Sequence, residues 1–209
     1  TKDKEFKTEF ENILKRAKSD IKGVSKIVEN IIDEIVEDGN EALKRHIEKF
    51  DKWIVKTDDE LLISQDSMKK AYETLDESLK KSLHIAYERI KAYHEKQLPK
   101  SWIDFEENGT ILGQKVTAVD RAGLYIPGGK AAYPSSLLMN AIPAKVAGVK
   151  EIVVCTPTPN NEVNELLLAA CHLCGVSKVY KVGGASAIAA MAYGAQTIPK
   201  VDVITGPGN

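Results

Sequence analysis

Cysteine is scarce in this sequence, and so is any excess of charge. Only three of the 209 residues are cysteines, too few and too unevenly placed for a disulfide framework, so we expect reduced thiols. Lysine and arginine number 29 against 30 aspartates and glutamates, a formal net charge of −1. This balance offers no basic field to a nucleic-acid backbone or an anionic membrane. Ligands should therefore be recognised by specific sites rather than by overall charge.

Long apolar runs are missing as well. No stretch approaches the roughly 20 apolar residues that a membrane-spanning helix requires, and the first ten residues lack the apolar segment of a secretory signal. We therefore expect a protein of the cytoplasm without nucleic-acid or membrane partners. With 43% hydrophobic residues, the chain can bury the core of one large domain or of two small ones.

The first hundred residues are rich in lysine and glutamate, and their apolar residues recur at helical spacing. Asn40 is a good N-cap, Gly39 should end the helix before it, and Pro99 should stop the last one. Helices are predicted at about 6–17, 27–38, 40–50, 65–75 and 77–97. A turn at Asn108-Gly109 between apolar segments then predicts a β-hairpin at about 102–119.

From Ala122 onward the composition shifts to glycine, alanine, valine and isoleucine. Strands are predicted at 123–126, 151–155, 178–182 and 201–204, alternating with helices at about 135–147, 162–174 and 185–193. Such alternation with short connections indicates a parallel sheet with right-handed crossovers. We therefore predict an α/β fold in which a mainly helical N-terminal domain with a β-hairpin, residues 1–122, precedes an incomplete Rossmann-like parallel βαβ domain, residues 123–209.

Glycine-rich turns follow three of the predicted strands, at 127–129, 183–184 and 206–208. Ligands of parallel sheets bind at the carboxyl ends of the strands, and glycine lets a phosphate or a nicotinamide approach the backbone. The dinucleotide fingerprint G-x-G-x-x-G is absent, however, and glycines also serve simply to turn the chain. Tyr125 lies at a strand end, where its ring could stack on a cofactor or pack in the core. The pattern leaves both alternatives open.

Other candidate groups favour structural roles. Cys171 and Cys174 lie at the C-terminal end of a predicted helix. The helix dipole lowers a thiol pKa only at the N-terminal end, so we expect these two cysteines to be small buried side chains. The histidines are scattered and are expected on the surface or half-buried rather than as metal ligands. They are His46, His84, His94 and His172. No grouping of serine, histidine and an acid indicates a nucleophilic triad.

Three segments carry a resemblance to a known family. The stretch 123–148, which begins Gly-Leu-Tyr-Ile-Pro-Gly-Gly-Lys, closely resembles histidinol dehydrogenase, the last enzyme of histidine biosynthesis. Residues 182–194 and 201–209, the latter ending in Gly-Pro-Gly-Asn, resemble the same family in order and spacing. The likeness before residue 120 is looser.

The resemblance implies a zinc-containing homodimer that uses two NAD to oxidise L-histidinol, through an aldehyde, to L-histidine. It places the zinc ligands and a proton-transferring Glu-His pair after the Gly-Pro-Gly-Asn motif, so we expect them outside this chain, which should be inactive by itself. The implied NAD contacts are Tyr125, position 186 and Asn209. Many relatives have glutamine at 186, whereas the shorter Ser186 is expected to reach the cofactor only through water. A non-catalytic nucleotide-binding fragment, or a relative that oxidises another small alcohol, remains an alternative.

Overall fold

The computed structural model describes residues 6–128 and 134–207, without the side chains of 12–22. The described helices are α1 (Phe6–Asp38), α2 (Asn40–Asp51), α3 (Gln65–Glu73), α4 (Glu77–Glu95), α5 (Pro134–Val146), α6 (Glu165–Cys174) and α7 (Gly184–Tyr193), with 3-10 turns η1 (Asp58–Leu61) and η2 (Pro159–Asn161). The described strands are β1 (Leu62–Ile63), β2 (Trp102–Phe105), β3 (Ile111–Gln114), β4 (Arg121–Tyr125), β5 (Glu151–Cys155), β6 (Lys178–Tyr180) and β7 (Val203–Thr205).

Five strands form one sheet in the order β1-β6-β5-β4-β7. Strands β4 to β7 are mutually parallel, which confirms the predicted α/β fold, and the order β6-β5-β4-β7 corresponds to 3-2-1-4 of a Rossmann sheet. The short edge strand β1 was not predicted and pairs antiparallel with β6. The N-terminal part of the chain therefore extends the sheet formed by the C-terminal part. The division into domains at residue 122 stays a prediction.

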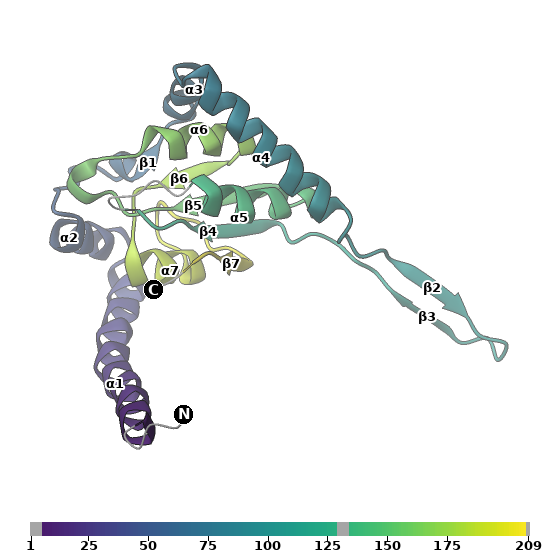
Figure 1. Ribbon diagram of the computed structural model, residues 1–209, viewed down its shortest axis with the longest axis horizontal. Coiled ribbons are helices and arrows are strands. Elements are labelled where there is room, and N and C mark those ends of the chain that lie inside the picture. The colour runs from purple at the N-terminus through teal and green to yellow at the C-terminus, as the bar shows by residue number, and fades with distance from the viewer. Residues whose placement is uncertain (1–5, 129–133, 208–209) are drawn as a thin grey trace.

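Helices cover both faces of the sheet (Figure 1), α3 to α6 on one face and α1, α2 and α7 on the other. Side chains alternate between the faces along each strand: Ile152 and Val154 pack under the first layer, and Val153 and Cys155 under the second. Because helices lie on both sides, the parallel strands are apolar on both sides.

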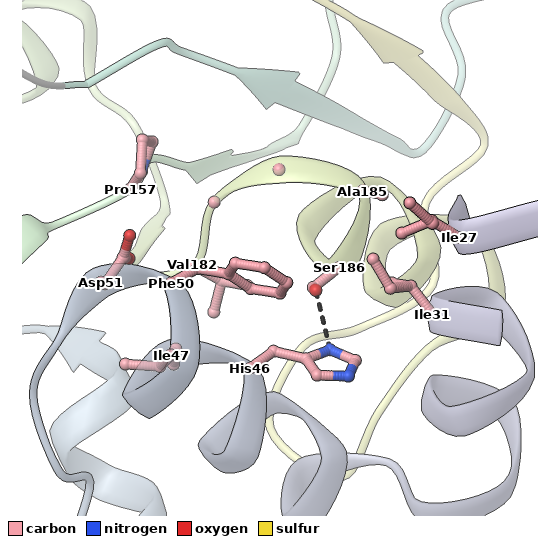
Figure 2. A pocket seen from close by; sticks show the side chains of 12 residues that line it. Ile27, Ile31, His46, Ile47, Phe50, Asp51, Pro157, Val182, Ala185 and Ser186 are labelled. Carbon is pink, nitrogen blue, oxygen red and sulfur yellow. Dashed lines mark hydrogen bonds between the residues drawn. The ribbon is translucent and has the colours of Figure 1, made fainter. Parts of the chain in front are cut away.

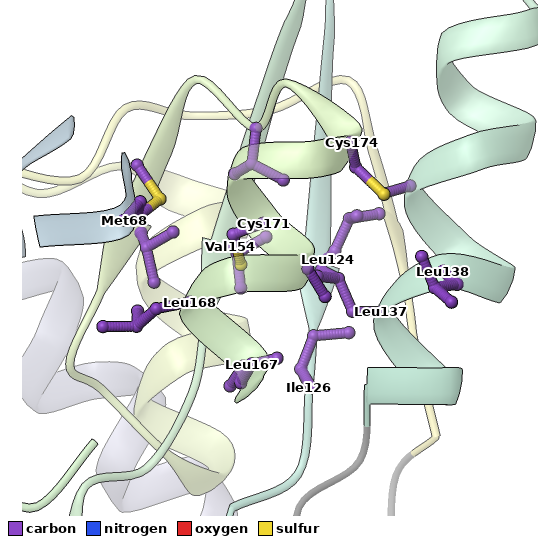
Figure 3. Close-up of a cluster of buried hydrophobic side chains, with 14 of the residues drawn as sticks. Met68, Leu124, Ile126, Leu137, Leu138, Val154, Leu167, Leu168, Cys171 and Cys174 are labelled. Carbon is purple, nitrogen blue, oxygen red and sulfur yellow. The ribbon is translucent and has the colours of Figure 1, made fainter. Parts of the chain in front are cut away.

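The three cysteines are free and buried, as predicted. Figure 3 shows Cys171 and Cys174 among the aliphatic side chains of the first core. Burial raises the pKa of all three thiols, that of Cys174 to about 12. They therefore act as small hydrophobic side chains.

Two predictions about the N-terminal helices were wrong. Residues 6–38 form one helix of 33 residues rather than two, because the connecting segment contains no proline and the exposed Gly23 costs only about 1 kcal/mol in a helix interior. Asn40 is not an N-cap but the first residue of α2. Gly39, at φ +55, occupies the cap position and turns the chain directly from α1 into α2.

The predicted hairpin is confirmed as β2 and β3, which pair antiparallel and project from the body of the molecule (Figure 1). Gly109 takes the turn with φ +86. Every residue of the two strands is exposed, including Trp102 and Phe105. Within 6–128 and 134–207, none of the helices is both long and apolar enough to cross a membrane.

Candidate functional site

The strand order changes direction beside β4. From β4 the chain builds β5 and then β6 on one side, and it returns to place β7 on the other side of β4. At such a switch point the loops leave the sheet in opposite directions, which opens a crevice outside the carboxyl ends of the two strands. A cavity of about 330 Å³ lies at this point, lined by Tyr125, Gly184, Ala185, Ile188, Ile204, Thr205 and Gly206. We call it the switch-point cavity.

Tyr125, the last residue of β4, contributes a wall of the switch-point cavity. Its side chain is half-buried, and its hydroxyl accepts a hydrogen bond of 3.2 Å from the backbone N–H of Gly184, the first residue of α7. This bond holds the ring between the end of a strand and the start of a helix. The structure thus places Tyr125 where a flat ligand could contact its ring.

A second cavity, of about 250 Å³, shares Gly184 and Ala185 with the first and extends toward α1 and α2 (Figure 2). The first turn of α7 therefore lies between two cavities. The α-helical side of this second cavity consists of Ile27, Ile31, His46, Ile47, Phe50 and Asp51, and the sheet side of Pro157, Val182 and Gly183 together with the start of α7. We call it the helical cavity.

Ser186 lines the helical cavity, whereas Tyr125 lines the switch-point cavity, so the structure brings these two predicted site residues to the same helix start but into different cavities. Ser186 is only 3% exposed. Its hydroxyl lies 2.9 Å from Nδ1 of His46 (Figure 2). Nε2 of the same imidazole lies 2.9 Å from a carboxylate oxygen of Glu34. The hydroxyl that was expected to reach the cofactor through water thus has a direct hydrogen-bond partner on α2.

This chain of serine, histidine and glutamate was not found from the sequence, where His46 was expected on the surface or half-buried. That expectation was wrong: the side of α2 that carries Leu43, His46 and Ile47 packs inward. The imidazole of His46 therefore links the hydroxyl of Ser186, at Nδ1, to the carboxylate of Glu34, which accepts from Nε2. The hydrogen bond from His46 lowers the pKa of Glu34. The apolar neighbours of His46 in the helical pattern were the one available signal of its burial.

The glycines of the three loops differ in whether the structure leaves room for a side chain at their position. At Gly128 and Gly183 an added Cβ would collide with Pro157, and at Gly206 it would collide with the backbone of Tyr125. Loop packing therefore requires glycine at these three positions, whatever the ligand. Gly184 differs from them because its Cβ would meet nothing within 4 Å and its φ is +60. It leaves the backbone open beside both cavities.

Some predicted features lie outside the described residues, namely Asn209, Gly129 and Gly208. Among the residues that are described, no three histidine, cysteine or acidic side chains are grouped so that they could hold a metal ion. These residues therefore do not fit a zinc site of their own.

Comparison with known proteins identifies the family. The family model for histidinol dehydrogenase matches residues 14–209. The chain belongs to the histidinol dehydrogenase family. It is 71% identical over 209 residues to the histidinol dehydrogenase of Sulfurimonas denitrificans, covering 100% of this chain and 49% of that protein. The histidinol dehydrogenase of Wolinella succinogenes is 66% identical over 205 residues, which cover 98% of this chain and 48% of that protein.

The fold of the histidinol dehydrogenase family is also recognisable in space. A crystal structure of histidinol dehydrogenase from Elizabethkingia anophelis matches with a TM-score of 0.82 at 33% identity, over 89% of this chain and 42% of that one. The chain thus spans about half the length of the histidinol dehydrogenases it matches. The resemblance seen in its motifs is confirmed.

Proposed function

We propose that this chain forms the NAD-binding part of an enzyme that oxidises L-histidinol, through histidinal, to L-histidine, the last step of histidine biosynthesis. The observation that carries the proposal is the switch-point cavity, which lies where open α/β sheets bind nucleotides and has the ring of Tyr125 on one wall. Membership of the family supplies the substrate. The activity is proposed for the whole protein, since the chain covers about half of its relatives.

NAD supplies the hydride acceptor, and the task of the protein is to hold and orient it. The N–H groups of Ala185 and Ser186 lie in the first turn of α7, where a helix has no internal acceptors for them, and the helix dipole adds partial positive charge. A pyrophosphate is suited to this position, and Gly184 allows its close approach. The fixed ring of Tyr125 offers a flat apolar surface to the nicotinamide.

Zinc, a homodimer and a cytoplasmic location are parts of the same proposal. No step is assigned to zinc in this chain, because its described residues contain no suitable ligand group. A second copy is consistent with the apolar side chains that stay exposed on α1 and on the hairpin, among them Val24, Trp102 and Phe105. Sedimentation of the full-length protein measures whether it is a dimer.

The test uses full-length protein with L-histidinol and NAD, followed by the absorbance of NADH. We expect turnover, and we expect Tyr125→Ala to raise the KM for NAD at least tenfold, about 1.4 kcal/mol. Tyr125→Phe keeps the ring and should change KM much less. Tyr93→Ala, at an exposed position of α4, is the matched control. Absence of NADH formation would overturn the proposed activity, and an unchanged KM in Tyr125→Ala would remove the tyrosine from the site.

A further inference from the structure

Asp51, the last residue of α2, is a buried carboxylate on the wall of the helical cavity. One of its oxygens accepts a hydrogen bond of 3.1 Å from the backbone N–H of Thr158. Within the described part of the chain it forms no ion pair, and burial raises its pKa. A carboxylate removed from water without a cation is costly to the fold, and such groups are concentrated at functional sites.

The hydrogen bond to Thr158 fastens Asp51 to a particular place in the sheet. Thr158 follows closely after Cys155, the end of β5, which is the second strand of the parallel unit β4-β5-β6. Dinucleotide-binding sheets carry an acidic residue near the end of their second strand, where it accepts hydrogen bonds from the ribose of the adenosine. The segment directly after β5, Thr-Pro-Thr-Pro at 156–159, contains no acid. Here Asp51 of α2, 107 residues away from Thr158 in the sequence, supplies a carboxylate at the end of β5.

The helical cavity has the chemistry of an adenosine site. Figure 2 shows Asp51 and Pro157 at one end of it, with the ring of Phe50 and the side chain of Val182 toward its middle. Apolar and aromatic walls suit a base, and a carboxylate suits the hydroxyl groups of a ribose. The helical cavity and the switch-point cavity lie on either side of the start of α7, and Gly184 and Ala185 line both. One dinucleotide can therefore lie with its nicotinamide by Tyr125, its pyrophosphate over Gly184 and its adenosine in the helical cavity.

We infer that Asp51 binds the adenosine ribose of the cofactor and selects NAD over NADP. The inference rests on the proposed use of NAD. In NADP a phosphate replaces the hydrogen of the 2′-hydroxyl, so the carboxylate loses a donor and meets negative charge instead. The preference for NAD over NADP therefore comes from the hydrogen bond that NADP cannot donate and from repulsion between the carboxylate and the phosphate. The residue responsible, Asp51, lies on α2, outside the parallel strands and their loops.

The experiment measures the binding of NAD, NADP and ADP-ribose to the full-length protein by calorimetry. Asp51→Asn removes the charge but keeps an oxygen for the N–H of Thr158. We expect it to lower the ratio of NAD affinity to NADP affinity at least tenfold and to weaken ADP-ribose, which lacks the nicotinamide. Tyr125→Ala should weaken NAD more than ADP-ribose. Asp66→Asn, which removes an exposed charge on the opposite face of the sheet, should change none of these affinities.

The outcomes separate the inference from the proposed function. If Tyr125→Ala weakens NAD while Asp51→Asn leaves the NAD-to-NADP ratio unchanged, the role of Asp51 is overturned and NAD binding stands. If the wild type binds neither dinucleotide, both fail. Should Asp51→Asn not fold, Phe50→Ala tests the same cavity at a side chain that is 53% exposed. Unchanged ADP-ribose affinity in that variant would overturn the placement of the adenosine.

Discussion

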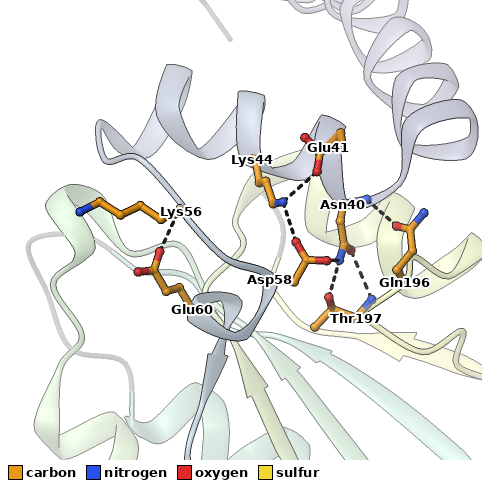
Figure 4. A network of polar contacts seen from close by, with 8 residues as sticks. All are labelled: Asn40, Glu41, Lys44, Lys56, Asp58, Glu60, Gln196 and Thr197. Carbon is orange, nitrogen blue, oxygen red and sulfur yellow. Dashed lines mark hydrogen bonds and ion pairs between the residues drawn. The ribbon is translucent and has the colours of Figure 1, made fainter.

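Asn40 ties the N-terminal helices to the segment between α7 and β7, and its removal should destabilise the protein measurably. Figure 4 shows the contacts. The side-chain amide donates to Asp58 at 2.7 Å and to the hydroxyl of Thr197 at 2.5 Å, and its oxygen accepts from the backbone N–H of Thr197 at 3.2 Å. The backbone N–H of Asn40 donates to Gln196 at 2.7 Å. The residue is 3% exposed, so water cannot readily replace these bonds.

Asn40→Ala removes the three side-chain bonds and leaves the backbone bond to Gln196. A neutral buried hydrogen bond contributes about 0.5–1.5 kcal/mol net, and one to a charged group about 1.5–3 kcal/mol. Asp58 keeps its ion pair with Lys44 at 2.6 Å and is 46% exposed, which places its bond at the lower end of that range. The expected loss in the free energy of unfolding is therefore about 3 kcal/mol.

Urea unfolding followed by the fluorescence of Trp53 measures this loss, because Trp53 packs in the same core as α2. Thr197→Val, which removes a single acceptor, should cost about 1 kcal/mol. Combined with Asn40→Ala it should add less than its own cost, since the two residues share their bonds. A loss below about 1 kcal/mol for Asn40→Ala would refute the view that these contacts stabilise the junction.

Three further predictions concern Ser186 and Gly206, which line the two cavities, and Glu34, which bonds to His46. Ser186→Ala leaves Nδ1 of the buried His46 without its partner and should cost about 1–2 kcal/mol in urea unfolding; an unchanged midpoint would argue against the bond. Because the hydrogen bond from His46 lowers the pKa of Glu34, the wild type has this stabilisation above the usual pKa of 4.5 and loses it as the pH falls through the lowered value. Glu34→Gln should lack that step in a plot of melting temperature against pH, and superimposable curves would contradict the pairing. Gly206, at φ +147, has no room for a side chain, because a Cβ would collide with the backbone of Tyr125. Gly206→Ala should therefore lower the free energy of unfolding by about 1–3 kcal/mol and weaken NAD binding. A variant with the NAD affinity and the thermal stability of the wild type would show that the two loops can move apart.

Local sequence patterns determined most of the secondary structure. Alternation of apolar segments with glycine-rich turns predicted each strand of the parallel sheet, and strand 151–155 has the predicted bounds. The reason is that apolar periodicity and turn residues act within a few neighbouring positions. The same patterns predicted the glycine loops at the carboxyl ends of the strands and placed Tyr125 at the end of β4. Its contact with the cofactor stays a prediction, as do those of Ser186 and Asn209.

Only the tertiary structure decided which distant side chains meet. His46 and Ser186 are 140 residues apart, and Asp51 and Thr158 are 107 apart, yet each pair forms a hydrogen bond across the packed helices and loops. The two-residue strand β1 likewise exists because β6 offers a free edge. None of these contacts has a local pattern, since each depends on how α2 and the segment after it lie against the finished sheet. The set of side chains that line the helical cavity was therefore decided by packing, whereas the position of the glycine-rich turn at its edge, Gly183-Gly184, could be predicted from the sequence.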